Sequence, residues 1–238
     1  MKAIIIGATS GIGRELAKQM SIDGYIVGVT GRRSNLLDSL AAELSGECVK
    51  SPMDLTDVKK SVEVLQELLC EMEDVDIVVI VSGTGSVDLD FPLSEELETV
   101  AVNVTGFTAI ANVAYHYFTK RKAGHIVGVS SVAAVRGGPM AAYNASKAYI
   151  SVYLEGLSCR CDVQNNNISV TDIRPGFVGT AMSKGEGIFW EAPVDKAVRQ
   201  MLIAIKKKRK VAYITKRWRL VAVLISSLPF RMYRRIIR

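Results

Sequence analysis

Short apolar runs alternate with longer segments of helical period along most of the chain. Seven runs are rich in Val and Ile and too short for helices: Ile4–Ile6, Tyr25–Thr30, Glu47–Lys50, Asp76–Val81, His125–Ser130, Ile168–Ile173 and Val211–Ile214. Between them, helix spacing recurs in Gly13–Ile22, Leu36–Leu44, Val58–Met72, Glu96–Phe118, Ala142–Asp162 and Val194–Ile205. This order predicts a doubly wound α/β fold, in which a parallel seven-stranded sheet carries helices on both faces. Its ligand should lie at the carboxyl ends of the strands.

The charge of the chain is divided between a body and a tail. Residues 1–195 carry a net charge of −8, whereas residues 196–238 contain 14 Lys and Arg, no acidic residue and a net charge of +14. The basic character therefore belongs to the tail, which argues against a nucleic-acid-binding protein and indicates an anionic partner for the C-terminus. We expect a single α/β domain over residues 1–210, and the last strand with a basic amphipathic helical extension over 211–238.

The N-terminal apolar run is only four residues long before it meets Gly7, which is too short for the core of a signal peptide. We therefore expect a cytoplasmic protein whose four cysteines are reduced thiols. Cys159 and Cys161 are separated by one residue, a poor match to zinc spacing, so no metal site is predicted.

A glycine-rich turn, Gly7-Ala8-Thr9-Ser10-Gly11-Ile12-Gly13, joins the first predicted strand to the first helix. Glycine allows a pyrophosphate to approach the backbone closely, and a helix N-terminus offers it free N–H groups. The alternative is a turn that uses glycine only for its positive φ. Three glycines together with Thr9 and Ser10 favour a dinucleotide site.

The second predicted strand ends in Gly31-Arg32-Arg33, without a carboxylate. An acid at this place binds the ribose 2′-hydroxyl of NAD, whereas an arginine pairs with the 2′-phosphate of NADP. We therefore predict NADP(H), with Arg32 as the main phosphate contact; Arg33 fits a solvated loop equally well. Asp54, after the third strand, either accepts a hydrogen bond from the adenine amino group or caps the helix that starts near Thr56.

Further motifs follow in a fixed order. They are Ser131, Tyr143-Asn144-Ala145-Ser146-Lys147, and Pro175-Gly176-Phe177-Val178-Gly179-Thr180. With the glycine turn they resemble the single-domain branch of the short-chain dehydrogenase/reductase family, over about the first 200 residues. The resemblance implies a Rossmann-type, NADP-binding catalytic domain.

Tyr143 and Lys147 are four residues apart and so share one face of a helix. A neighbouring ammonium favours the phenolate and lowers its pKa, which would suit Tyr143 to proton transfer. The alternative is a packed tyrosine and an extended lysine on an ordinary helix. The resemblance implies that Tyr143 protonates a carbonyl while NADPH delivers hydride, and that Lys147 also binds the nicotinamide ribose.

The resemblance also implies a serine that steadies the substrate oxygen. The usual spacing to the tyrosine selects Ser130, but the local pattern Ser-Val-Ala-Ala selects Ser131, at the end of the strand, and we assign Ser131. Because strand side chains alternate between faces, only one of the two serines can point into the site. Asn103 resembles the family's helix-kinking asparagine, whose carbonyl holds a water that links Lys147 to solvent. The alternative for Asn103 is a plain polar residue inside a helix.

The resemblance assigns the nicotinamide carboxamide to the backbone of Val178 and the hydroxyl of Thr180. Where relatives carry Asn-Asn-Ala-Gly after the fourth strand, this chain has Ile80-Val81-Ser82-Gly83, so we expect altered cofactor contacts there without loss of chemistry. The predicted cofactor-binding residues are Gly7, Thr9, Ser10, Gly11, Ile12, Gly13, Arg32, Asp54, Gly83, Tyr143, Lys147, Pro175, Gly176, Val178 and Thr180.

Residues 180–192 contain Gly185, Gly187, Phe189 and Trp190, a composition that suits a mobile lid and an apolar substrate. The alternative is a segment packed on the body. In the tail, the uncharged run Leu220–Phe230 is too short to span a bilayer, which needs about 20 helical residues. Residues 206–238 fit either a helix on an anionic membrane surface or a helix packed on the protein or on a second subunit. Docking on an acidic acyl-carrier protein is less favoured, because the apolar run needs burial.

The sequence therefore predicts an NADPH-dependent reductase of a ketone, a 3-oxoacyl or other lipid-like carbonyl compound, with Tyr143, Lys147, Ser131 and Asn103 carrying the chemistry. The resemblance also implies a homo-oligomer, a dimer or tetramer. The membrane alternative for the tail would add a peripheral location at the inner membrane surface. The alternative function is an NADP-binding redox sensor or scaffold without turnover.

Overall fold

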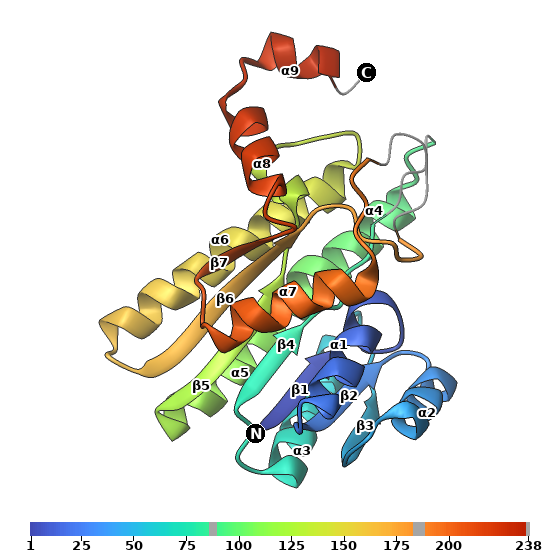
Figure 1. The fold of residues 1–238 in the computed structure, drawn as a ribbon, viewed down its shortest axis with the longest axis vertical. Coiled ribbons are helices and arrows are strands. Elements are labelled where there is room, and N and C mark those ends of the chain that lie inside the picture. The colour runs from blue at the N-terminus through green and yellow to red at the C-terminus, as the bar shows by residue number, and fades with distance from the viewer. Residues whose placement is uncertain (86–89, 183–188, 237–238) are drawn as a thin grey trace.

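The computed structural model describes residues 1–85, 90–182 and 189–236. Seven parallel strands form one sheet in the order β3-β2-β1-β4-β5-β6-β7 (Figure 1). The strands are β1 (Lys2–Ile6), β2 (Ile26–Gly31), β3 (Cys48–Pro52), β4 (Ile77–Ile80), β5 (Ala123–Val129), β6 (Asn167–Pro175) and β7 (Val211–Ile214). The predicted doubly wound sheet is confirmed, and most strand bounds differ from the predicted ones by only one or two residues.

The helices alternate with the strands over most of the chain. They are α1 (Gly11–Ile22), α2 (Ser34–Glu43), α3 (Val58–Met72), α4 (Leu93–Val100), α5 (Phe107–Arg121), α6 (Ala141–Val163), α7 (Val194–Lys206), α8 (Trp218–Ser227) and α9 (Phe230–Ile236). A π-helical turn, η1 (Ala101–Gly106), joins α4 to α5, and a 3-10 turn, η2 (Val132–Val135), follows β5. The division of the chain at residue 210 stays a prediction.

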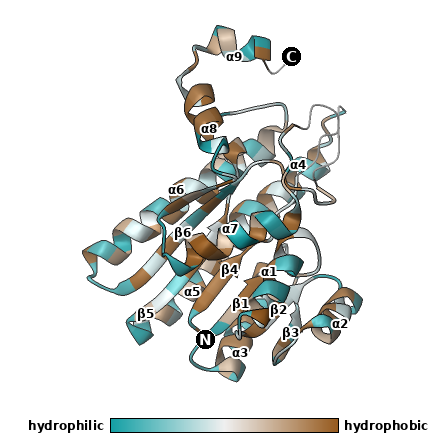
Figure 2. Cartoon of the chain, viewed as in Figure 1, coloured by the Kyte–Doolittle hydropathy of each residue, from teal (hydrophilic) through white to brown (hydrophobic). Residues whose placement is uncertain are grey.

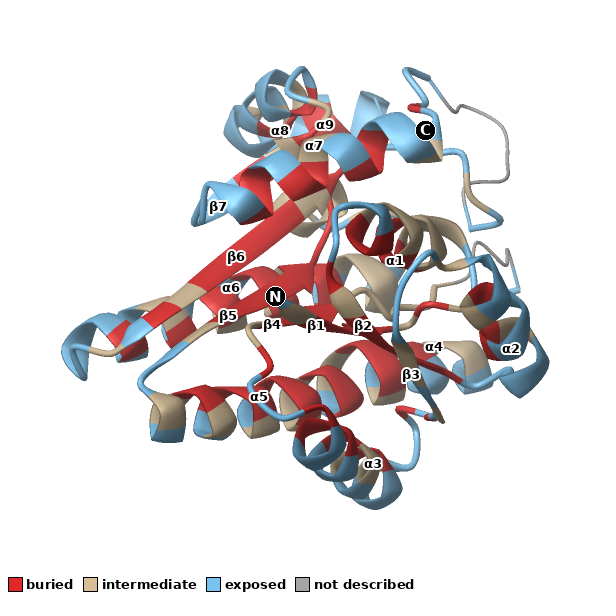
Figure 3. Cartoon of the chain, turned by 60° about the horizontal axis from the view of Figure 1, so that its bottom comes forward, coloured by how far each residue is buried: buried red, intermediate tan, exposed pale blue. Residues whose placement is uncertain are grey.

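Each central strand supplies side chains to two apolar layers, because successive strand residues point to opposite faces. Ala3 and Ile5 of β1 join the layer under α1, α2 and α7, whereas Ile4 and Ile6 join the layer under α3, α5 and α6. Figure 3 shows the buried sheet between these two sets of helices. Burial on both faces explains why the strands lack polar alternation.

The helix predicted over Glu96–Phe118 is a composite of α4, η1 and α5. Within the described residues, Leu93–Arg121 is the stretch long and apolar enough to cross a membrane by length and composition. Its α5 part, however, buries Phe107, Ile110 and Phe118 against the sheet. It is therefore a core helix of the fold.

A buried imidazole on β5 gives the fold a pH-dependent stability. His125 is hydrogen-bonded to the Thr171 hydroxyl at 2.8 Å, and burial lowers the pKa of His125 to about 4. The unfolded chain, with an ordinary histidine pKa of about 6.5, binds the extra proton first as the pH falls. We expect the free energy of unfolding to decrease by roughly 3 kcal/mol between about pH 6.5 and pH 4 on account of this group.

His125→Asn should remove that part of the acid dependence, as measured by urea unfolding over this pH range. The matched control is His116→Asn, which replaces the exposed histidine of α5 and should keep the parent's slope. An unchanged slope in His125→Asn would show that another group destabilises the protein in acid.

Candidate active site

Four segments converge where the parallel strands end. The glycine turn follows β1, residues 81–85 follow β4, Ser131 lies just beyond β5, and Pro175 closes β6. Because parallel strands end at the same edge of a sheet, these segments lie together at that edge, where open α/β sheets bind their ligands. We call this place the crevice.

The glycine turn has the shape of an anion cradle. Gly7 has φ of 95°, a conformation that side-chain-bearing residues rarely adopt, and a Cβ on Gly13 would collide with the Gly7 carbonyl oxygen. Helix α1 starts after Ser10 without a side-chain cap and without an acidic residue in its first turn. Its first N–H groups are therefore available to a phosphate. Ile12, also in this turn, packs its side chain on the core under α1.

The two arginines after β2 point to different partners. Arg33 lies over the glycine turn, where its Nη2 donates to Thr9 Oγ1 at 2.9 Å and to Ser10 Oγ at 3.0 Å. Arg32 instead pairs with Glu98 of α4, with Nη1 3.2 Å from Oε1. The structure thus brings Arg33 to the predicted phosphate site and places Arg32 at its rim.

Asp54 makes a local turn. Its Oδ1 accepts from the Thr56 amide at 3.0 Å and from the Thr56 hydroxyl at 2.9 Å. The cap of α3 is Asp57, which accepts from the Lys60 amide at 3.1 Å. Asp54 therefore orders the loop that precedes α3 and remains exposed beside the crevice.

Tyr143 and Ser131 meet at the centre of the crevice. The Ser131 hydroxyl lies close enough to the Tyr143 phenol to lower its pKa, while Ser131 Oγ accepts from the Ala133 amide at 3.1 Å and donates to the Pro175 carbonyl at 3.5 Å. Ser130 points elsewhere, donating to Asp172 Oδ1 at 2.5 Å. Burial raises the pKa of Tyr143, and the hydrogen bond from Ser131 opposes that rise. The sequence argument expected the ammonium of Lys147 to lower this pKa, but in the structure burial dominates, so the phenol keeps its proton.

Lys147 lies behind Tyr143 on the same face of α6. Its Nζ is 5.6 Å from the centre of the Tyr143 ring and donates to the Val129 carbonyl at 3.0 Å. Burial lowers the pKa of Lys147 to about 8, while the carboxylate of Asp172 acts in the opposite direction. Lys147 is thus a buried cation that titrates close to neutrality.

Asn103 lies within the π-helical turn η1. Its Oδ1 accepts from the Thr84 amide at 2.9 Å, and its Nδ2 donates to the Thr84 carbonyl at 2.7 Å and to Ser146 Oγ at 2.9 Å. The helix is therefore distorted where the asparagine was predicted to kink it. The amide ties the loop after β4 to the helix that carries Tyr143 and Lys147.

Two glycines after β4 leave room for side chains of α6. A Cβ on Gly83 would lie 3.0 Å from Lys147 Nζ, and one on Gly85 would collide with the ring of Tyr143. Gly85 was not predicted as a site residue. In the sequence, Gly85 is recognisable only as the second glycine of Gly83-Thr84-Gly85. It lies just after Ile80-Val81-Ser82-Gly83, the four residues that correspond to the family's Asn-Asn-Ala-Gly.

Asp172 on β6 is a second residue that the sequence argument missed. It is almost fully buried, accepts from Ser130 and forms an ion pair with Arg174, whose Nε lies 2.6 Å from Oδ2. Arg174 also donates to the Tyr213 hydroxyl at 3.1 Å. A single aspartate in an apolar strand belongs to no motif, so the sequence does not identify it as a site residue. In the structure its negative charge raises the pKa of Lys147.

The segment after β6 runs back over the glycine turn. Pro175 ends the strand, the buried Val178 forms a bridge with Ala192, and the Thr180 methyl lies 3.2 Å from where a Cβ on Gly11 would be. The absence of a side chain at Gly176 leaves the space that the Trp218 indole fills. Thr180 and Gly11, two of the predicted cofactor-binding residues, thus lie close together.

Four aromatic rings gather beside this segment. Trp218 of α8 lies 5.5 Å from Phe177, 5.2 Å from Phe189 and 6.2 Å from Trp190, measured between ring centres. We call these four residues the aromatic cluster. Gly185 and Gly187 of the predicted lid lie outside the described residues. The C-terminal end of the predicted lid therefore contacts α8 through Phe189 and Trp190, and Phe177, which precedes the predicted lid, contacts the same indole.

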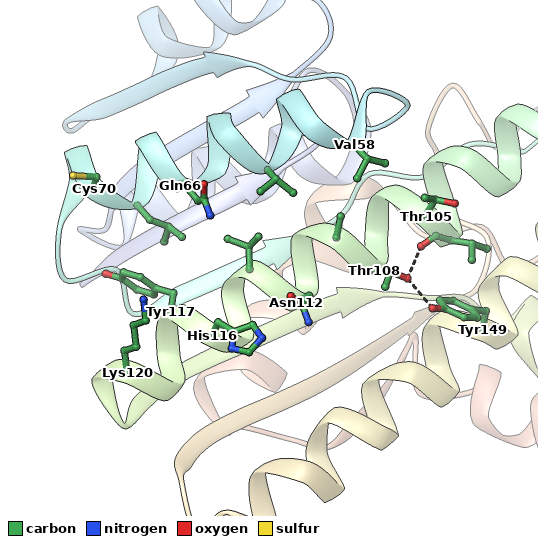
Figure 4. Close-up of a pocket in the computed structure, with 15 residues that line it drawn as sticks. Val58, Gln66, Cys70, Thr105, Thr108, Asn112, His116, Tyr117, Lys120 and Tyr149 are labelled. Carbon is green, nitrogen blue, oxygen red and sulfur yellow. Dashed lines mark hydrogen bonds between the residues drawn. The ribbon is translucent and has the colours of Figure 1, made fainter.

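A separate groove of about 1040 Å³ lies between α3 and α5. Figure 4 shows Gln66, Asn112, His116 and Tyr149 along it, with Thr108 hydrogen-bonded to Tyr149. None of the predicted catalytic residues lines this groove. It does not belong to the crevice.

Comparisons with known proteins agree with this arrangement. A family model for short chain dehydrogenases matches residues 1–187. An uncharacterized oxidoreductase of Myxococcus xanthus is 35% identical over 187 residues, which cover 76% of this chain and 73% of that protein.

Among solved structures, a short chain dehydrogenase/reductase from Burkholderia phymatum in complex with NAD has a TM-score of 0.83 at 19% identity, covering 94% of this chain and 92% of that one. ElxO with NADP bound has a TM-score of 0.77 at 18% identity, covering 90% and 96%. These two similar folds hold different nicotinamide cofactors, so the choice between NAD and NADP has to be argued from this chain's own residues.

Proposed function

Because this chain belongs to the short-chain dehydrogenase family of oxidoreductases, we propose that it reduces an apolar ketone to a secondary alcohol with NADPH. One observation carries the proposal. The hydroxyls of Tyr143 and Ser131 meet in a crevice whose other wall is a glycine turn shaped for a pyrophosphate, and Lys147 lies directly behind them.

The residues at the glycine turn fit a dinucleotide. The cradle at Gly7 and Gly13 excludes side chains, and the uncapped start of α1 offers N–H groups to the pyrophosphate. Lys147 Nζ lies next to the space left open by Gly83, where it would hold the nicotinamide ribose. When bound, the cofactor supplies the hydride that is added to the carbonyl carbon.

The chain's own groups supply the proton. Burial keeps Tyr143 protonated, so the phenol is a donor for a carbonyl oxygen that gains negative charge. The Ser131 hydroxyl, which lies beside the phenol, orients the same oxygen. Lys147 places its positive charge behind the ring and stabilises the phenolate left after proton transfer. Asn103 keeps the loop after β4 in register with α6 and is a positioning residue here.

The proposed preference for NADPH depends chiefly on Arg33. Its guanidinium is bound to the Thr9 and Ser10 hydroxyls, at the edge of the phosphate cradle, and no carboxylate ends β2. Arg33→Glu should weaken NADPH binding by about 10- to 100-fold and leave the affinity for NADH within about threefold, because a charge-assisted contact contributes about 1.5–3 kcal/mol. Titration calorimetry with each cofactor measures both affinities.

Arg32→Glu is the matched comparison. Since Arg32 is paired with Glu98 at the rim, its reversal should cost less than that of Arg33. If Arg32→Glu loses more NADPH affinity than Arg33→Glu, Arg32 is the main contact of the 2′-phosphate, as predicted from the sequence. Equal NADPH affinity in both variants and in the parent would remove the basis for NADP preference.

The aromatic cluster supports an apolar substrate. Phe177, Phe189 and Trp190 are partly exposed beside the crevice, where their rings offer apolar surface to a ligand. A panel of ketones that differ in chain length, with NADPH oxidation as the signal, tests the proposal. Faster turnover of the longer, more apolar ketones is the expected result.

We also propose that the chain forms a homo-oligomer. The groove between α3 and α5, with Tyr149 of α6 at its edge, is an apolar concavity on a helical face. Packing of a second copy there would cover surface that one copy leaves open. Sedimentation velocity of the full chain gives the mass, and a monomer at all concentrations would contradict this part of the proposal.

A further inference from the structure

Helix α8 presents an apolar stripe to solvent. Trp218 and Ala222 are buried against the body, whereas Leu220, Val223 and Leu224 point outward. Residues three and four apart share a helix face, so these three side chains form one continuous strip. Leu220 is 76% exposed and Leu224 59%, and Figure 2 shows α8 as a hydrophobic helix that projects from the body.

Helix α9 adds further exposed apolar side chains. It buries Tyr233 but exposes Phe230, Met232 and Ile236. We call the six exposed side chains of the two helices the α8–α9 face: Leu220, Val223, Leu224, Phe230, Met232 and Ile236. The described part of the chain leaves this face uncovered, which is an unusual concentration of large apolar side chains for a protein surface.

One arginine holds both helices in place. Arg136, just after η2, donates from Nη1 to the Ile225 carbonyl at 2.8 Å and to the Leu228 carbonyl at 2.5 Å. Its guanidinium also lies 4.3 Å from the centre of the Tyr233 ring. The Tyr233 hydroxyl in turn donates to the Gly137 carbonyl at 2.6 Å. The α8–α9 face is therefore presented by helices fixed to the body, and not by a frayed terminus.

The charges around the face decide what can cover it. Arg219, Arg231, Arg234 and Arg235 are exposed among the apolar side chains, and residues 196–238 contain no acid. In a twofold dimer through this face, each arginine would meet the same set of arginines on the partner, which is repulsive. The complementary surface is apolar at its centre and negatively charged around it, as an anionic lipid bilayer is.

We propose that the α8–α9 face docks on an anionic lipid bilayer. The six apolar side chains enter the acyl boundary, while the arginines extend to the phosphate groups. Helix α8 begins inside the aromatic cluster, and Arg217 Nη2 donates to the Trp190 carbonyl at 2.8 Å. Docking thus brings the substrate side of the crevice to the lipid surface. This last consequence rests on the proposed function, whereas the docking itself does not.

The test is flotation of the full chain with vesicles of phosphatidylcholine alone or of phosphatidylcholine with phosphatidylglycerol. The parent should bind the anionic vesicles and lose binding as salt rises, because screening shortens the range of the arginine charges. Leu220→Glu and Leu224→Glu should each weaken vesicle binding at least about tenfold, from lost apolar burial and an added negative charge. Arg231→Ala should weaken it about fivefold, from the loss of one positive charge.

Matched controls separate docking from general effects. Ile203→Glu replaces an exposed apolar residue of α7, and Lys59→Ala removes an exposed charge from α3; both should bind as the parent does. Tyr143→Phe should also bind normally, so a failed reductase and a failed docking surface give different results. The proposal is overturned if the parent ignores anionic vesicles or if Leu220→Glu binds them unchanged. A loss of oligomer mass in Leu224→Glu without vesicle binding would assign the face to a protein partner instead.

Discussion

Tyr143→Phe should reduce kcat/KM for ketone reduction by about 10²- to 10⁴-fold, the range in which a positioned acid contributes to catalysis. The variant loses one hydroxyl, which lies beside that of Ser131, and keeps the ring that packs against Gly85. NADPH affinity, measured by calorimetry, should stay within about threefold of the parent, since the cofactor would still be held by the glycine turn and Lys147. Absorbance of NADPH in a ketone panel gives the rate.

Tyr153→Phe is the matched control. Tyr153 lies on the same helix, α6, but packs against Tyr149 and Phe107 away from the crevice. The loss of its hydroxyl should leave the rate within about twofold of the parent. Equal rates in Tyr143→Phe and the parent would remove the proposed acid. A parent that binds NADPH tightly and reduces no ketone would favour a sensor or scaffold.

Asp172→Asn should affect both stability and the pH profile. The substitution leaves the guanidinium of Arg174 largely buried without its counter-charge, which should cost about 2–3 kcal/mol of unfolding free energy. It also removes the carboxylate that supports the charge on Lys147. The pKa of Lys147, held at about 8 in the parent, should then fall further.

The dependence of the reduction rate on pH shows in which direction the pKa of Lys147 moves. Lys147 loses its proton as the pH rises through its pKa, so reduction by the parent should decline above about pH 8. In Asp172→Asn the same decline should begin at a lower pH. Asp162→Asn, which breaks an exposed pair with Lys210, is the control and should change stability by less than about 0.5 kcal/mol. If the rate of Asp172→Asn declines at the same alkaline pH as that of the parent, Asp172 does not influence the reaction through Lys147.

The fold was predictable because burial on both faces leaves a direct trace in the sequence. Runs such as Ile4–Ile6 and Ile77–Ile80 contain only residues that a covered sheet accepts, and the helices between the strands show their apolar stripe. The π-helical turn at Asn103 was predicted only as a kink, through the family resemblance. Its exact hydrogen-bond pattern depends on Thr84 and Ser146, which are distant in sequence.

The site was predictable where spacing determines geometry and less so where side-chain direction does. Tyr143 and Lys147 share a helix face by their separation alone. Arg32 and Arg33 leave the same strand end, and nothing in their order tells which one reaches Thr9 and which one reaches Glu98. The sequence shows that a cation, Lys147, neighbours Tyr143, and a cation alone lowers the pKa of a phenol. The sequence does not show how deeply Tyr143 is buried, and burial has the larger effect on its pKa.

The contact between Gly176 and Trp218 limits how this protein can be recombined with its relatives. The indole occupies the space directly above the Gly176 backbone, and its ring nitrogen is buried there without a hydrogen-bond partner among the described residues. A chimaera that takes its last residues from another protein would have to bring a residue that fills the same space. Otherwise the exchange would open a hole beside the carboxyl end of β6, so α8, α9 and residues 175–178 should be exchanged as one unit.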